Sequence, residues 1–91
     1  MTYRVYLHAQ AVKEIEGLEK RVRTLVKAAV SGLSDNPTPV GCAKLKGRIN
    51  AYRLRVGDYR ILYEVHATEI VVYVFGIAHR KEAYLRLLRR P

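Results

Sequence analysis

Two strand-forming runs on either side of Gly57-Asp58 place the strongest constraint on the fold of this 91-residue chain. Except at Leu62, residues 52–56 and 59–63 alternate tyrosine or aliphatic residues with arginine, which is typical of half-buried β-strands. Glycine at the first central position favours a two-residue type II′ turn. We therefore predict a β-hairpin in which Arg55 lies directly opposite Arg60.

This hairpin is predicted to have two chemically different faces. The alternation gives one face to six apolar or aromatic side chains: Tyr52, Leu54, Val56, Tyr59, Ile61 and Tyr63. Arg53, Arg55 and Arg60 share the other face. Like charges placed opposite each other destabilise a sheet, so their crowding points to an anion-binding site. A solvated face of an ordinary antiparallel sheet is the alternative that the hairpin alone leaves open.

The charge balance favours the anion. Lys plus Arg number 17 against 8 Asp plus Glu, and the formal charge of +9 predicts a polyanionic or strongly acidic partner. Length and an apolar fraction of 49% predict one domain over residues 1–91. Cys42 is the only cysteine, and no apolar run reaches the length of a membrane span. We expect a cytoplasmic protein with no membrane association, metal site or cofactor.

The remaining chain predicts an α+β fold. Residues 2–7 read as a first strand, and residues 11–33 have helical periodicity. Their length and Gly17 favour a break between Gly17 and Lys20 that makes a helical hairpin, and one continuous helix is the alternative that the sequence leaves open. Residues 70–78 are almost continuously apolar, which predicts a strand covered on both faces, and Gly76 indicates either a bulge or a close backbone approach. A short helix should close the chain. The predicted architecture is therefore a strand and a helical hairpin packed on a small antiparallel sheet, with a short C-terminal helix.

A second candidate segment, 79–84, follows the apolar strand directly. In a helix Arg80 and Tyr84 lie four residues apart and share a face. Arginine binds phosphate through its planar fork, and tyrosine offers a ring on which a base can stack. Joined to the hairpin arginines, this combination suits RNA. Ordinary solvated helix positions are expected for Glu14, Glu16 and Glu19.

The order of these motifs resembles the RelE/ParE superfamily of toxins from toxin–antitoxin pairs, and within it the RelE-like mRNA interferases. The resemblance covers nearly the whole chain, and its most specific elements are Gly57-Asp58-Tyr59-Arg60 and His79-Arg80-Lys81. It implies a RelE-like, microbial-ribonuclease-like fold and a metal-independent endoribonuclease. Such an enzyme cuts mRNA in the ribosomal A site by attack of a 2′-hydroxyl on the scissile phosphate, which inhibits translation and arrests growth.

The resemblance also implies partners. A cognate acidic antitoxin, RelB-like or of another family, would neutralise the toxin. The two would form a hetero-oligomer able to bind operator DNA through the antitoxin, and the ribosome and mRNA would be the targets. Codon preference, complex stoichiometry and a strict need for the ribosome stay open at this point.

Carried over position by position, the resemblance implies a role for each candidate residue. Arg60 and Arg80 bind the scissile phosphate, Arg55 lies on the catalytic strand, and Tyr84 stacks on or orients a nucleotide. Some relatives have lysines at the positions of Arg53 and Arg55, and arginine is a poor base because it stays charged. His79 is the first candidate for the general base, since histidine titrates near neutrality, and Tyr84 is the second. A structural hydrogen bond is the alternative role for His79.

Other basic residues are candidates for RNA-phosphate contacts, which position a protein without reading sequence. These are Arg53, Lys44, Lys46, Arg48 and Lys81. Two rival functions remain at this stage. One is a ParE-like toxin that inhibits DNA gyrase by binding and has no nuclease activity, and the other is a basic nucleic-acid-binding or corepressor module.

Overall fold

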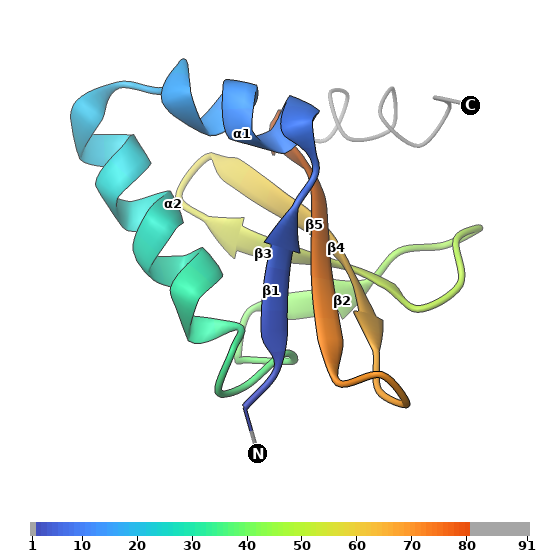
Figure 1. The fold of residues 1–91 in the computed structure, drawn as a ribbon. Coiled ribbons are helices and arrows are strands. Elements are labelled where there is room, and N and C mark those ends of the chain that lie inside the picture. The colour runs from blue at the N-terminus through green and yellow to red at the C-terminus, as the bar shows by residue number, and fades with distance from the viewer. Residues whose placement is uncertain (1, 81–91) are drawn as a thin grey trace.

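Two helices lie on one face of a five-stranded sheet in the computed structural model, which describes residues 2–80 (Figure 1). The elements in chain order are β1 (Arg4–Leu7), α1 (Ala9–Glu16), α2 (Lys20–Gly32), β2 (Cys42–Lys44), β3 (Ala51–Val56), β4 (Tyr59–His66) and β5 (Val71–His79). The strand order across the sheet is β1-β5-β4-β3-β2. This arrangement confirms the α+β prediction and the break between two helices. The predicted C-terminal helix lies outside the described residues.

The sheet is antiparallel, as predicted, except at the edge formed by β1. There β1 runs parallel to β5, with Arg4 opposite Val71 and Leu7 opposite Val74. The direction of this pairing depends on how the whole intervening chain returns to the edge, which no local pattern records. The sequence analysis also missed β2, whose three residues are too few to display an alternation.

The β3–β4 hairpin has the predicted register. Arg55 pairs with Arg60 and Val56 pairs with Tyr59, so two residues form the turn. Gly57 has a φ of 59°, whereas Asp58 is not among the residues with positive φ. A positive φ at the first central residue alone is the pattern of a type II′ turn, so the prediction from the glycine position is confirmed.

The turn glycine gives a first testable prediction. We expect Gly57→Ala to lower the free energy of unfolding by about 1–2 kcal/mol, because an L-residue with positive φ crowds its own backbone. A Cβ at this position would meet no atom within 4 Å, so the cost is conformational rather than steric. Gly32→Ala is the matched control, since Gly32 ends α2 without positive φ and with open space around it. Urea unfolding should find this variant unchanged or slightly stabilised, and equal losses in both variants would contradict the assignment.

The main core lies between the helices and the sheet. Ala11, Ile15, Val26 and Val30 from the helices pack against residues of β3, β4 and β5. The buried members that the strands contribute are Leu54, Ile61, Tyr63, Val72, Val74 and Ile77. The predicted apolar face of the hairpin is therefore the face that the helices cover.

A β-bulge, one of the two features that Gly76 indicated, interrupts β5. Leu62 pairs with Gly76 but the next residue, Tyr63, pairs with Val74, which leaves Phe75 as an extra residue. The extra residue reverses the alternation of side chains along the rest of β5. Residues Val72, Val74 and Ile77 therefore belong to the core under the helices, whereas Phe75 and Ala78 join a second apolar cluster on the other face with Leu45, Ala51 and Leu62.

Glu14 does not behave as the solvated helix residue that its sequence context predicted. Its Oε1 accepts a hydrogen bond of 2.9 Å from the backbone N–H of Ile77 in β5. The partner strand β1 pairs with β5 only as far as Val74, so the edge of β5 continues beyond it. Glu14 binds this extension and ties α1 to the strand that leads into the candidate site.

Candidate active site

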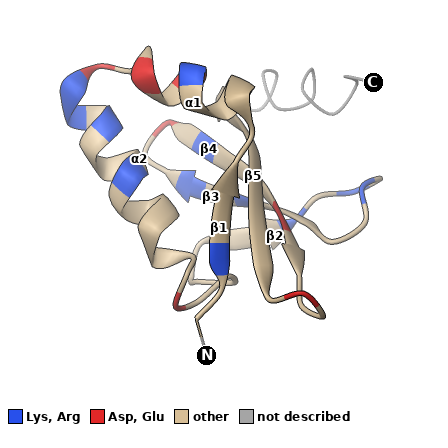
Figure 2. Ribbon diagram, in the orientation of Figure 1, with Lys and Arg blue, Asp and Glu red and all other residues tan. Residues whose placement is uncertain are grey.

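The predicted arginines share the sheet face opposite α1 and α2, which we call the arginine face. Figure 2 shows basic segments on both β3 and β4 close to their connecting turn. The backbone N–H of Arg55 donates to Gly41 O at 3.4 Å, on the β2 side of the strand. Arg55 and Arg60 therefore form a non-hydrogen-bonded cross-strand pair, the type in which the Cα atoms come within about 4.5 Å. Two like charges thus occupy the closest cross-strand position that a sheet offers.

Both guanidinium groups turn towards the same backbone oxygen. Nε of Arg55 donates to Gly57 O at 3.4 Å, and Nη1 of Arg60 donates to it at 3.5 Å. Nη1 of Arg60 also donates to Tyr59 O at 3.1 Å. Two charged donor groups converging on one oxygen form the kind of arrangement that binds an oxyanion, because charge-assisted hydrogen bonds to an anion are stronger than those to a neutral carbonyl.

Arg80 reaches the same turn through its backbone. Its N–H donates to Asp58 O at 3.1 Å, and its side chain is exposed. Arg80 has a φ of 74°, in the left-handed region that costs a non-glycine residue free energy and that clusters at functional sites. The hydrogen bond fixes the backbone of this strained residue at the turn, so Arg80 lies at the same end of the hairpin as the Arg55–Arg60 pair.

No carboxylate neutralises these arginines within residues 2–80. The ion pairs there join Glu64 to Arg48 and to His66, and neither involves the hairpin arginines. Asp58 lies in the turn, but it is exposed and forms no ion pair with them. Within these residues, the positive charge at the turn is not neutralised by an ion pair.

The structure separates His79 from the arginine pair. His79 lies opposite Tyr59, and their ring centroids are 4.7 Å apart. Tyr59 packs against the core under the helices, so the His79 ring belongs to that face, whereas Arg60 lies opposite Ala78 on the arginine face. The bulge in β5 causes this separation.

The other candidate residues fall into four groups. Arg53 lies on the arginine face opposite Leu62 and is half-buried. Lys44 lies opposite Tyr52, so strand alternation assigns it to the helix-covered face instead. Lys46 and Arg48 belong to the loop between β2 and β3. Lys81 and Tyr84 lie outside the described residues.

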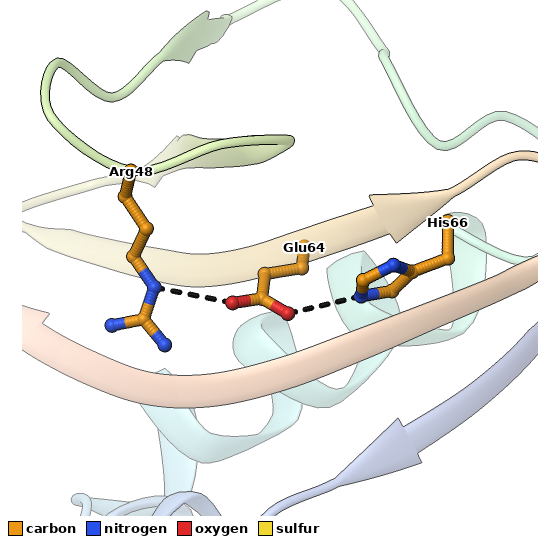
Figure 3. Close-up of polar contacts among 3 residues, drawn as sticks. All are labelled: Arg48, Glu64 and His66. Carbon is orange, nitrogen blue, oxygen red and sulfur yellow. Dashed lines mark hydrogen bonds and ion pairs between the residues drawn. The ribbon is translucent and has the colours of Figure 1, made fainter.

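The sequence analysis missed Glu64 and Phe75, which hold Arg48 in place. Glu64 Oε2 accepts from Arg48 Nε at 3.1 Å, and Glu64 Oε1 lies 3.0 Å from His66 Nε2 (Figure 3). The Arg48 guanidinium carbon lies 3.9 Å from the Phe75 ring centroid. One signal was present: Glu64 is the acidic member of the alternating positions Arg60, Leu62 and Glu64. Residues 2–80 contain no group of three or more histidine, cysteine, aspartate or glutamate side chains placed to hold a metal ion.

The sequence profile of the ParE toxins of type II toxin–antitoxin systems (parDE) matches residues 5–84. This chain belongs to that toxin family. Among its relatives, toxin RelE3 of Methanocaldococcus jannaschii is 34% identical over 74 residues, covering 80% of this chain and 82% of the relative. The mRNA interferase toxin RelE of Escherichia coli K12 is 29% identical over 94 residues, covering 99% and 98%.

Solved structures of the RelE/ParE superfamily share the fold. The toxin chain in the archaeal RelE–RelB complex from Pyrococcus horikoshii OT3 superposes with a TM-score of 0.80 and 33% sequence identity, covering 91% of this chain and all of that chain. The superfamily membership that the hairpin and the His79-Arg80-Lys81 segment predicted is confirmed. No helix within the described part of this family member is long and apolar enough to span a membrane.

Proposed function

We propose that this chain is an mRNA interferase, the toxin of a toxin–antitoxin pair. The observation that carries the proposal is the convergence of the Arg55 and Arg60 guanidinium groups on one oxygen beside Arg80. A scissile phosphate would replace the Gly57 carbonyl oxygen as the acceptor. The similarity to proteins named RelE and mRNA interferase RelE supports this function over a passive basic binding module.

The arginines act on charge rather than on protons. In the proposed reaction the 2′-hydroxyl of a ribose gives up its proton as its oxygen bonds to the adjacent phosphorus and forms a cyclic phosphate. The P–O5′ bond breaks, and the leaving 5′-oxygen takes up a proton to become a 5′-hydroxyl. Arg55, Arg60 and Arg80 stabilise the negative charge that develops on the phosphate oxygens, which is the largest single contribution in many enzymes. The chemistry requires no metal from the protein.

The general base is a separate question, because arginine stays charged and cannot accept the proton. The contact between the tilted rings of His79 and Tyr59 supports a structural role for this histidine. We therefore assign to Tyr84, the second candidate for the general base, the role of accepting the proton of the 2′-hydroxyl, together with stacking on the substrate nucleotide. This assignment predicts that His79→Gln retains cleavage and that Tyr84→Phe loses it.

Partners and location follow from the same proposal. The ribosome and mRNA are the targets in the cytoplasm, and an acidic antitoxin of the RelB type or another family neutralises the toxin. The charge of +9 favours fast association with such a partner. The resulting complex is a hetero-oligomer that binds operator DNA through the antitoxin.

The family profile is that of ParE toxins, so a ParE-like toxin that inhibits DNA gyrase without nuclease activity is the rival. The test adds the purified chain to a translating extract and maps the mRNA ends. We expect cuts within codons at the ribosomal A site and unchanged gyrase supercoiling in a parallel assay. Intact mRNA together with blocked supercoiling would overturn the proposal in favour of the gyrase-inhibiting toxin.

A further inference from the structure

A second cationic group lies on the arginine face, away from the hairpin turn. Arg48 extends from the β2–β3 loop onto β4 and β5, where Glu64 binds its Nε and Phe75 lies against its guanidinium plane. His66 contacts the other oxygen of the same carboxylate, so Arg48, Glu64 and His66 form a row (Figure 3). The basic side chain is thus held in one orientation by a carboxylate and a ring.

The contacts leave part of Arg48 available. The ion pair to Glu64 is made through Nε, and the Arg48 side chain keeps 34% of its surface exposed. Figure 3 shows the two terminal nitrogens of Arg48 outside the contact with Glu64. An arginine fixed in this way loses less conformational entropy on binding than a mobile surface arginine would, because its orientation is already set.

The position of Arg48 fits a single strand of RNA that also contacts the hairpin arginines. Glu64 is four residues beyond Arg60 on the same face of β4, which corresponds to about 13 Å along a strand. Leu62, Ala51 and Ala78 are buried beneath this part of the face, and the half-buried Arg53 lies opposite Leu62 on the neighbouring strand. A short single strand can cross this distance with one phosphate at Arg60 and a neighbouring nucleotide at Arg48.

We propose that Arg48, backed by Phe75 and oriented by Glu64, is a second nucleotide-binding subsite for single-stranded RNA. A base stacks on the exposed face of the guanidinium, since arginine planes and aromatic rings are the surfaces on which proteins stack unpaired bases. Glu64 is a positioning residue that acts through Arg48. This subsite deepens the proposed nuclease function, because it extends the substrate contact beyond the scissile phosphate.

The test measures binding of a ten-nucleotide, fluorescently labelled 2′-O-methyl RNA, which cannot undergo attack by a 2′-hydroxyl. In fluorescence anisotropy titrations at fixed salt we expect Arg48→Ala to weaken binding about tenfold, within the range of one lost stacking contact. Arg48→Lys keeps the charge but loses the plane, and it should recover only part of the affinity. Phe75→Leu should weaken binding as well. Arg21→Ala, on the exposed side of α2, is the control for a generic loss of one charge.

The direction in which truncation of Glu64 changes the RNA affinity decides between a positioning role and a simple electrostatic effect. Removing a carboxylate from an RNA-binding surface tightens binding by simple electrostatics, whereas the positioning role predicts that Glu64→Ala weakens binding about threefold. Glu64→Gln, which still offers an oxygen to Arg48, should bind nearly as well as the parent protein. Tighter binding by Glu64→Ala, or an unchanged affinity in Arg48→Ala, would overturn the subsite.

Experiments can contradict the Arg48 subsite and the nuclease function independently of each other. Cleavage at A-site codons with RNA binding that is indifferent to Arg48 overturns the subsite and keeps the nuclease function. Arg48-dependent RNA binding without any cleavage keeps the subsite and overturns the nuclease. If Arg48→Ala binds RNA normally but loses affinity for the cognate antitoxin, the surface is a protein interface and the subsite is wrong.

Discussion

Arg60→Ala should reduce the rate of mRNA cleavage about 100- to 1,000-fold, the effect of removing one donor that stabilises transition-state charge. The Arg60 guanidinium donates to Gly57 O, the oxygen to which Arg55 also donates, and Arg60 lies opposite Arg55 in the hairpin. Its loss removes one of the groups placed to bind the scissile phosphate. The measurement is the single-turnover rate of A-site cleavage on programmed ribosomes, with the ends mapped by primer extension.

The same substitution should leave stability unchanged or raise it. Truncating Arg60 removes a like-charge pair with Arg55, and such opposed pairs cost a sheet about 0.2–1 kcal/mol. Activity and stability would then change in opposite directions, which is the behaviour of a site that accepts a structural cost for function. A variant that unfolds more easily and cleaves proportionally less would instead identify Arg60 as a structural residue.

Two controls separate the contribution of the planar guanidinium donors to cleavage from that of the positive charge. Arg60→Lys keeps a cation but loses the planar set of donors, so its cleavage rate should fall between those of the parent and of Arg60→Ala. Arg21→Ala removes an exposed arginine from the outer side of α2 and should cleave normally. Normal cleavage by Arg60→Ala would show that the convergence on Gly57 O has no catalytic role.

The hairpin was predictable because everything that specifies it lies within twelve residues. Alternation assigned Tyr52, Leu54 and Ile61 to the core and the arginines to the opposite face, and the glycine at 57 set the register. A slip by one residue would expose the whole apolar set, so the pattern admits one pairing. The bulge at Gly76 was one of two features that the glycine itself indicated.

The consequence of that bulge was not predictable. Without the extra residue, alternation along β5 would place His79 on the arginine face, as its choice as general base requires. The bulge at Phe75 reverses the alternation and places His79 with Tyr59. A glycine in a strand indicates that a bulge is present, but the pairing with β4 decides which residue is the extra one.

Contacts between distant segments were also outside the reach of the sequence. The Arg48–Glu64 ion pair joins residues 16 positions apart, and the Glu14 bond to Ile77 joins residues 63 positions apart. Each depends on where a loop or helix meets the sheet. The residue type of Glu14 alone indicated a solvated carboxylate, which is the commoner environment for glutamate.

Tyr63→Ala should cause the largest loss of stability of any change considered for this chain, about 3–5 kcal/mol by the measure of other buried aromatic truncations. The Tyr63 side chain is fully buried, its ring stacks on Tyr52 at 5.8 Å, and its hydroxyl donates to Pro37 O at 2.8 Å. A domain of 91 residues has only about 5–14 kcal/mol in total. Urea unfolding should therefore find a strongly lowered midpoint for Tyr63→Ala, and a midpoint close to that of the parent would contradict the packing of this ring.

Tyr63→Phe isolates the hydroxyl from the ring. It should cost only about 0.5–1.5 kcal/mol, the net value of one hydrogen bond, and it should also change the response to alkaline pH.

Burial, and next the neighbouring Cys42 thiol, raise the pKa of the Tyr63 phenol well above its ordinary value. Below the pKa of about 10 that tyrosine has in an unfolded chain, the group is neutral in both states and stability does not depend on its titration. Above that pH the unfolded chain loses the proton first, so stability falls as pH rises. The parent should lose stability between pH 10 and the folded-state pKa more steeply than Tyr63→Phe does, and identical alkaline slopes would show that the phenol is not held neutral in the core.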